Sequence, residues 1–177
     1  QPTYNAEQLN GYPVITADGS NDLMLGSGLG QESGSHYFIA VVRDDESVGQ
    51  CYLLDAQSGR LSIGRENYGT EALLITDSTG YASRYFHLSS MPDTFSVVEF
   101  VLESGGNRRI FVNGVERGTG SEYTDTEIGG AVALFSHHNE AQNFISASLT
   151  FMGYKQGGIT TAQRAYLLNG LRAKYGI

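Results

Sequence analysis

The sequence predicts an all-β sandwich of two antiparallel sheets with one short α-helix at the C-terminal end. Three observations support this fold class. Strand-like runs recur at fairly even spacing, and several alternate apolar with polar residues. The composition, with 23 glycines and only 17% charged residues, suits many short strands joined by turns. A length of 177 residues is ample for one core, so we expect a single domain over residues 1–177.

The expected strands follow one another along most of the chain. They are Pro13–Ala17, Leu23–Gly26, His36–Arg43, Gly49–Leu54, Leu61–Arg65, Glu71–Thr76, Ala82–Leu88, Ser96–Glu103, Arg108–Val112, Ala131–Ser136 and Phe144–Tyr154. In the last strand, the apolar residues from Ile145 to Phe151 alternate with polar ones, which predicts an antiparallel sheet with one solvated face. In Ser96–Glu103, Val98 and its alternate neighbours point inward, whereas Glu99 faces a mixed environment.

Two dipeptides predict tight turns. Asn113-Gly114 lies between apolar residues and favours a type I′ hairpin turn, in which both central residues need a positive φ. Asp18-Gly19 marks an earlier turn between the first two expected strands.

The segment 161–175 is predicted to be an amphipathic helix. Thr160 is a good N-cap residue, Gln163 completes a capping box, and Gly176 is suited to the C-cap. The expected apolar stripe contains Ala165, Leu168, Leu171 and Tyr175, and the expected opposite side contains Arg164, Asn169, Arg172 and Lys174. We therefore expect the helix to cover the sandwich as a structural lid.

Charge and hydropathy exclude some classes of partner. The net charge of −8 and the pI near 4.8 argue against nucleic acid and against anionic membrane surfaces. No run of 18 apolar residues is present, so we expect no membrane insertion. The single cysteine, Cys51, lies in an apolar run and is expected to be an inert thiol in the core.

Several segments, in the same order along the chain, resemble laminin-G-like domains of the concanavalin A-like lectin and glucanase superfamily, in their bacterial or phage form. They are Gln1–Tyr4, Asn10–Val14, Asp18–Asp22, the hairpin Arg109–Val115, and the C-terminal segments Ile159–Arg164 and Leu171–Ile177. The resemblance implies a jelly-roll sandwich. Its members include lectins, carbohydrate-binding and adhesion modules, virion components and some glycan-cleaving enzymes, so the fold alone does not choose a function.

Two groups of residues are candidates for binding a glycan. Tyr81, Tyr85 and His87 share one face of an expected strand, and tyrosine rings stack on sugars while hydroxyl and imidazole groups form hydrogen bonds. The second group, His137, His138 and Asn139, follows Phe135 in an expected loop at the rim of the sandwich. The alternatives are an ordinary solvated sheet face and a polar connection that binds nothing.

Calcium is a candidate cofactor, because the resemblance implies a fold in which calcium is common. Asp18, Asn21 and Asp22 are candidate oxygen ligands, and turn-forming Asp and Asn residues are the alternative interpretation. The paired carboxylates of a glycoside hydrolase are not found on any expected strand, and no catalytic residue is assigned.

These observations predict a non-catalytic module that binds a glycan or cell-surface polysaccharide. The chain begins at Gln1, and we expect it to be part of a larger extracellular, cell-surface or virion-associated assembly, in contact with other domains or subunits. A structural interaction domain, such as a phage decoration, fibre or tail component without a sugar site, is the alternative. A glycan-cleaving enzyme is the third class.

Overall fold

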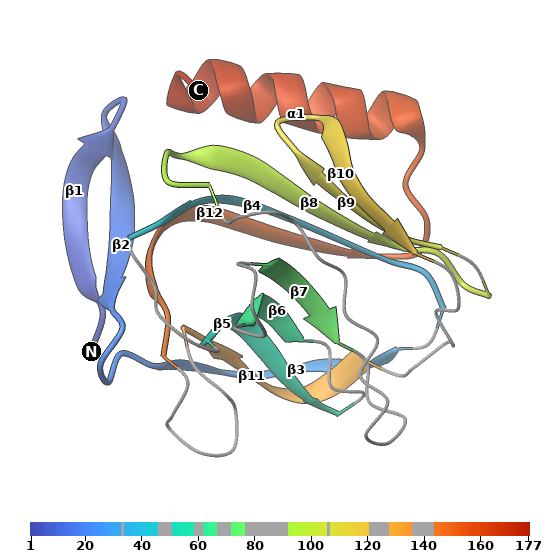
Figure 1. Ribbon diagram of the computed structural model, residues 1–177, viewed down its shortest axis with the longest axis horizontal. Coiled ribbons are helices and arrows are strands. Elements are labelled where there is room, and N and C mark those ends of the chain that lie inside the picture. The colour runs from blue at the N-terminus through green and yellow to red at the C-terminus, as the bar shows by residue number, and fades with distance from the viewer. Residues whose placement is uncertain are drawn as a thin grey trace.

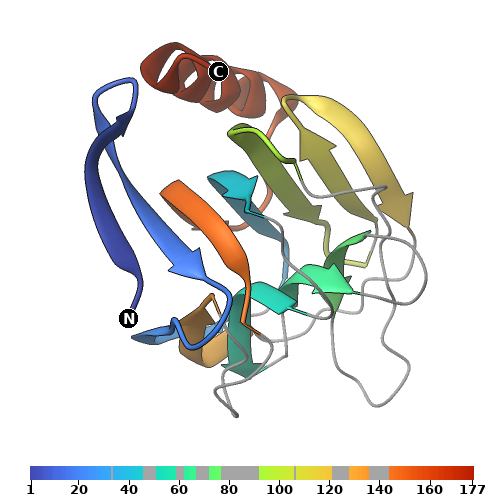
Figure 2. The same cartoon turned by 60° about the vertical axis from the view of Figure 1, so that its left-hand side comes forward.

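The computed structural model describes residues 1–32, 34–45, 51–58, 62–66, 72–76, 92–105, 107–120, 128–135 and 144–177. Within them, helix α1 (Thr161–Tyr175) covers one face of a seven-stranded sheet, and a five-stranded sheet lies against the other face (Figures 1 and 2). The predicted fold class, two antiparallel sheets with a short C-terminal helix, is confirmed. No helix in these residues is long and apolar enough to cross a membrane.

The strand order brings distant parts of the chain together. The larger sheet runs β1 (Thr3–Leu9), β2 (Tyr12–Asp18), β12 (Ser146–Gln156), β4 (His36–Asp44), β8 (Ser96–Leu102), β9 (Arg108–Val112) and β10 (Val115–Gly120). The smaller sheet runs β3 (Met24–Glu32), β11 (Ile128–Leu134), β5 (Cys51–Ser58), β6 (Ser62–Glu66) and β7 (Ala72–Thr76). β1 and β10 are additional to the expected strands, and the expected strand Ala82–Leu88 lies outside the described residues.

The middle of the larger sheet is buried on both faces. Val98, Phe100 and Leu102 of β8 belong to the core between the two sheets, as the alternation predicts. Val97 and Val101 belong to a second apolar cluster, which lies beneath α1 together with Leu171 and Tyr175. The face expected to be mixed is therefore covered by the helix, and Glu99 is fully buried in it.

A β-bulge changes the faces of β12. Its pairing with β4 shifts between Leu149 and Phe151, so one extra residue is accommodated there. Leu149 contributes to the core between the sheets, whereas Phe151 packs against the cluster beneath the helix. The prediction that these two residues share a face is therefore wrong, because a single inserted residue reverses the alternation.

The Asn113-Gly114 hairpin turn is confirmed. Both residues have positive φ angles, 51° and 82°, and Val112 pairs directly with Val115. The turn is tied to β8, because Asn113 Oδ1 accepts a hydrogen bond from the Val97 amide at 2.9 Å. A Cβ atom at Gly114 would lie 2.4 Å from Leu168 Cδ2, so α1 rests closely on this turn.

The helix has the predicted bounds and caps. Thr160 Oγ1 accepts a hydrogen bond from the Gln163 amide, Gln163 Oε1 accepts one from the Thr160 amide, and Gly176 ends the helix with a φ of 70°. Leu171 and Tyr175 are buried, as expected, but Ala165 is exposed. Arg164 faces the sheet instead. Arg164, Leu168, Leu171 and Tyr175 follow successive spacings of 4, 3 and 4, and residues with these spacings lie along one side of a helix.

Candidate functional site

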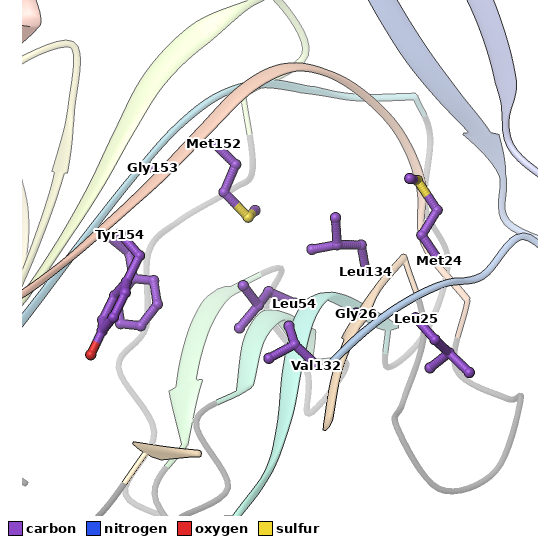
Figure 3. Close-up of a pocket in the computed structure, with 10 residues that line it drawn as sticks. Met24, Leu25, Gly26, Leu54, Val132, Leu134, Met152, Gly153 and Tyr154 are labelled. Carbon is purple, nitrogen blue, oxygen red and sulfur yellow. The ribbon is translucent and has the colours of Figure 1, made fainter. Parts of the chain in front are cut away.

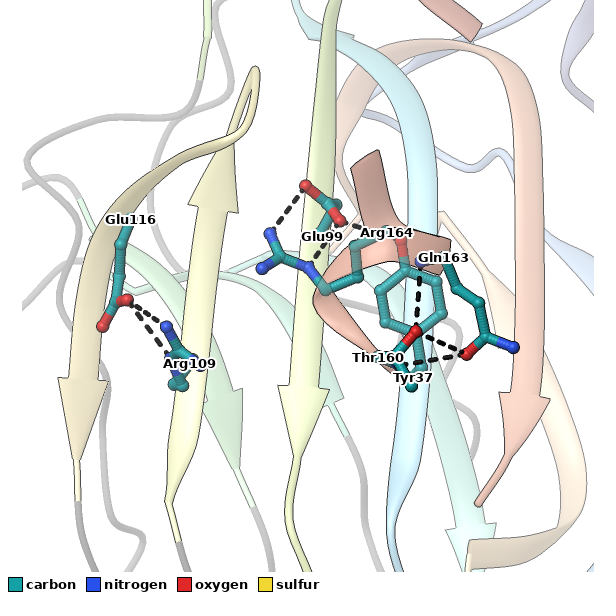
Figure 4. Close-up of polar contacts among 7 residues, drawn as sticks. All are labelled: Tyr37, Glu99, Arg109, Glu116, Thr160, Gln163 and Arg164. Carbon is teal, nitrogen blue, oxygen red and sulfur yellow. Dashed lines mark hydrogen bonds and ion pairs between the residues drawn. The ribbon is translucent and has the colours of Figure 1, made fainter. Parts of the chain in front are cut away.

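Beneath α1, a buried carboxylate joins three elements. Glu99 of β8 has no solvent exposure, and its Oε2 accepts a hydrogen bond from the Tyr37 hydroxyl of β4 at 2.8 Å (Figure 4). Arg164 of α1 binds the same carboxylate with both Nε and a terminal nitrogen, at 3.0 and 3.1 Å. We call Tyr37, Glu99 and Arg164 the carboxylate cluster.

The carboxylate cluster connects α1 to β4 and β8 through hydrogen bonds and an ion pair. The Arg164 guanidinium also lies 3.4 Å from the centre of the Phe111 ring, where a cation is attracted to the π-electrons. The prediction that Arg164 lies on the outer side of the helix is therefore wrong. Because the helix covers Glu99 completely, this carboxylate is shielded from solvent, and its role in the described structure is to position α1.

Burial strongly affects the Tyr37 hydroxyl. Removal from water, followed by the neighbouring Glu99 charge and hydrogen bond, raises the pKa of Tyr37 well above its usual range, while Arg164 opposes part of the rise. In the unfolded chain this pKa is about 10. A raised pKa in the folded state means that the stabilisation is complete below pH 10 and is lost as the pH rises further.

We predict that wild-type protein loses roughly 1 kcal/mol more free energy of unfolding between pH 10 and 11 than a Tyr37→Phe variant, which lacks the titrating group. Urea unfolding followed by circular dichroism at stepped pH values measures this difference. Tyr166→Phe is the matched control, because Tyr166 is 80% exposed and should leave the wild-type slope unchanged. Equal slopes for wild type and Tyr37→Phe would contradict the prediction.

A row of polar side chains crosses the edge of the larger sheet, from β1 through β2 and β12 to the end of β4. The Asn5 amide donates to Thr16 Oγ1, which lies 3.1 Å from Ser148 Oγ. Ser148 Oγ in turn donates to Asp45, which also pairs with Arg43. These groups satisfy one another, so the row holds the strands together rather than presenting unpaired groups to a ligand.

The three candidate calcium ligands lie in one turn between β2 and β3. Asp22 Oδ2 accepts a hydrogen bond from the Asp18 amide, and Asp18 Oδ1 accepts one from the Ser20 amide, both at 2.8 Å. Asn21 is exposed. These bonds show the turn chemistry that was the alternative interpretation. Calcium binding by Asp18, Asn21 and Asp22 stays a prediction.

The candidate glycan residues Tyr81, Tyr85, His87, His137, His138 and Asn139 lie outside the described residues. The structure does describe both ends of the segment that contains the last three. Phe135 is fully buried, its amide donates to Leu53 O, and its carbonyl accepts a hydrogen bond from the Ile145 amide at 3.1 Å. Phe135 and Ile145 therefore form a closed stem, and the rim loop that carries His137, His138 and Asn139 stays a prediction.

This stem lies beside the Asp18 turn. Ser146, which follows the stem, pairs with Asp18 in the register of β12 and β2. A Cβ atom at Gly19 would lie 3.1 Å from Ser146 Cβ, so the turn and the stem are in contact. Two candidate sites that are more than 100 residues apart in sequence thus start from the same end of the sandwich, which sequence reasoning missed.

Tyr154 of β12 faces the core between the sheets. Its hydroxyl lies 2.9 Å from Nδ1 of the buried His36, and the two rings are stacked. Lys155 lies on the opposite face of β12 and donates to Gly158 O at 2.7 Å. The pleat of the strand therefore places the two side chains on opposite faces.

The architecture defines a class: it is a jelly-roll, concanavalin A-like β-sandwich. No protein-family model matches the chain, and no curated protein matches it either. Solved structures match in fold. Domain 4 of AbnA, a GH43 extracellular arabinanase from Geobacillus stearothermophilus in complex with arabinotriose, matches with a TM-score of 0.74 and 13% identity, over 95% of this chain and 81% of that one.

Two further structures show the same fold. The ligand-binding domain of botulinum neurotoxin serotype D, in complex with N-acetylneuraminic acid, has a TM-score of 0.67 at 10% identity, and the match covers 95% of this chain but 44% of that one. A native heptameric SAP-like pentraxin from Limulus polyphemus has a TM-score of 0.58 at 15% identity, over 86% of this chain and 84% of that one. At these identities the likeness establishes the fold.

Proposed function

We propose that this chain is a non-catalytic glycan-binding module that resembles the bacterial or phage type of laminin-G-like domain, carried by a larger extracellular or virion-associated protein. The observation that supports this most is the match to domain 4 of the arabinanase, whose structure is in complex with arabinotriose. The match to part of a neurotoxin ligand-binding domain, whose structure is in complex with N-acetylneuraminic acid, is a second support. Both matches span 95% of this chain, and they cover 81% of the arabinanase domain but 44% of the neurotoxin chain.

The proposed site is the end of the sandwich where the Asp18 turn contacts the Phe135–Ile145 stem. In the sequence, His137, His138 and Asn139 lie between the two ends of the stem, and Tyr81, Tyr85 and His87 would supply aromatic rings. Stacking of tyrosine on a sugar ring and hydrogen bonds from imidazole and amide groups would provide recognition. Asp18, Asn21 and Asp22 at the same end would hold calcium where the glycan requires it.

A glycan array probed with the isolated chain, in calcium and in chelator, tests the proposal. The Tyr85→Ala, His138→Ala double variant is expected to weaken binding by about tenfold or more, since loss of stacking and a hydrogen bond together exceeds about 1.4 kcal/mol. Tyr166→Ala is the control, because this exposed ring lies on α1 and outside the proposed site.

Three results would contradict the proposal. Folded protein that binds no glycan in either condition contradicts the function, and an effect of Tyr166→Ala equal to that of the double variant contradicts the site. Release of reducing ends, or a rise in the absorbance of unsaturated sugars, contradicts the non-catalytic part.

A further inference from the structure

A cavity of about 330 Å³ lies between the two sheets, beside β3 at the edge of the smaller sheet (Figure 3). Its floor is formed by Leu54 of β5 with Val132 and Leu134 of β11. On the opposite side Met152 of β12 points toward this floor. None of the described residues that line the cavity is charged.

The register of β3 explains the open side. Met24 pairs with Leu134 and Gly26 pairs with Val132, and residues paired across two strands present their side chains on the same face. Met24 therefore points into the sandwich, as Figure 3 shows, whereas Leu25 is 66% exposed and lines the cavity at its outer side.

Gly26 leaves a gap in this edge strand. Among the described residues, a Cβ atom built at Gly26 would have one non-neighbouring atom within 4 Å, the Val132 carbonyl oxygen at 3.8 Å. The neighbouring Met24 is 38% exposed although it lines the cavity. A missing side chain beside a partly exposed, flexible thioether makes an entrance from solvent to the space between the sheets.

The size and lining of the cavity define the chemistry of its occupant. A cavity of about 150 Å³ takes up benzene, so a cavity of twice that volume has room for roughly twelve carbon atoms. A sugar is a poor fit, because its hydroxyl groups would be buried against Leu, Val and Met side chains without partners. The Tyr154 hydroxyl at the inner end is already 2.9 Å from His36 Nδ1.

We infer that this cavity binds the alkyl chain of an acylated or lipid-like molecule. The two methionines, on opposite sheets, adapt to a flexible chain better than rigid side chains would. The aliphatic floor runs between two packed layers, which favours a narrow chain over a bulky ring system. This ligand is distinct from the glycan of the proposed function, and the inference does not depend on that function.

The test uses 1-decanol as the probe and follows the methionine methyl groups by ¹³C NMR in the intact chain. Addition of 1-decanol is expected to shift the signals of Met24 and Met152 in a saturable way. Gly26→Phe, which introduces a ring at the entrance, is expected to weaken this binding by about tenfold or more. Val115→Phe introduces the same ring at a 54% exposed position on β10, away from the cavity lining, and is expected to leave binding unchanged.

Circular dichroism establishes that both variants are folded. A second probe, 2-naphthol, tests the shape of the ligand, because it has as many heavy atoms as 1-decanol. Absence of saturable shifts up to the solubility limit of 1-decanol would overturn the inference. Equal weakening by Gly26→Phe and Val115→Phe would overturn the location. Tighter binding of 2-naphthol than of 1-decanol would overturn the choice of an alkyl chain. Glycan binding is scored separately, so failure of either proposal leaves the other one testable.

Discussion

Replacement of Arg164 by methionine is expected to lower the free energy of unfolding by about 3–5 kcal/mol, because it leaves the fully buried Glu99 carboxylate without its charged partner. The second variant, Glu99→Gln with Arg164→Met, should recover more than half of the loss. The neutral amide oxygen still accepts the Tyr37 hydrogen bond, and the buried charge is gone. Urea denaturation at neutral pH measures both changes.

Arg172→Met is the matched control for Arg164→Met. Arg172 lies on the same helix but is exposed, so its replacement is expected to change the free energy of unfolding by no more than about 0.5 kcal/mol. If Arg164→Met were as stable as this control, the buried pair would not hold the helix.

The second large effect is expected for Leu171→Ala. Leu171 is 9% exposed and packs in the cluster beneath α1, so its truncation should cost about 2–4 kcal/mol through lost burial and the space left behind. Leu167→Ala, one turn earlier and 37% exposed, should cost less than about 1 kcal/mol. A thermal-shift series gives the comparison, and a neutral Leu171→Ala would show that the helix is not docked.

The helix and the hairpin could be predicted from sequence because their signals are local. Thr160 and Gln163 at one end of the helix, and Gly176 at the other, form hydrogen bonds with backbone groups only a few residues away. The Asn113-Gly114 turn depends on the positive φ angles of these two residues alone. Tertiary structure adds nothing that would overrule these signals, so the predicted bounds and caps are correct.

The orientation of Arg164 could not be predicted from charge alone. A rule that places charged residues outward fails where a buried carboxylate offers a partner. Here the partner, Glu99, lies on β8, 65 residues from Arg164 in the sequence. One signal did exist. Arg164, Leu168, Leu171 and Tyr175 follow spacings of 4, 3 and 4, a more regular stripe than one that begins at Ala165.

For the candidate sites as well, local features could be predicted from the sequence, whereas contacts between distant segments could not. The Asp18 turn was recognised because Asp and Gly mark turns by their own chemistry, and its hydrogen bonds agree. Its contact with the Phe135–Ile145 stem depends on the pairing of β12 with β2, which no local pattern contains. The predicted face of Phe151 is wrong for a related reason. The bulge that places Phe151 on the other face of β12 arises in the pairing with β4.

The position of β12 has a consequence for how the chain folds during synthesis. β12 pairs with β2 on one side and β4 on the other, so a late segment is inserted between two early ones. Until it leaves the ribosome, β2 and β4 each expose an unpaired edge that is open to association with other chains. Closure of the larger sheet therefore waits for the C-terminal segment, and such non-local pairing makes folding slow for a domain of this size.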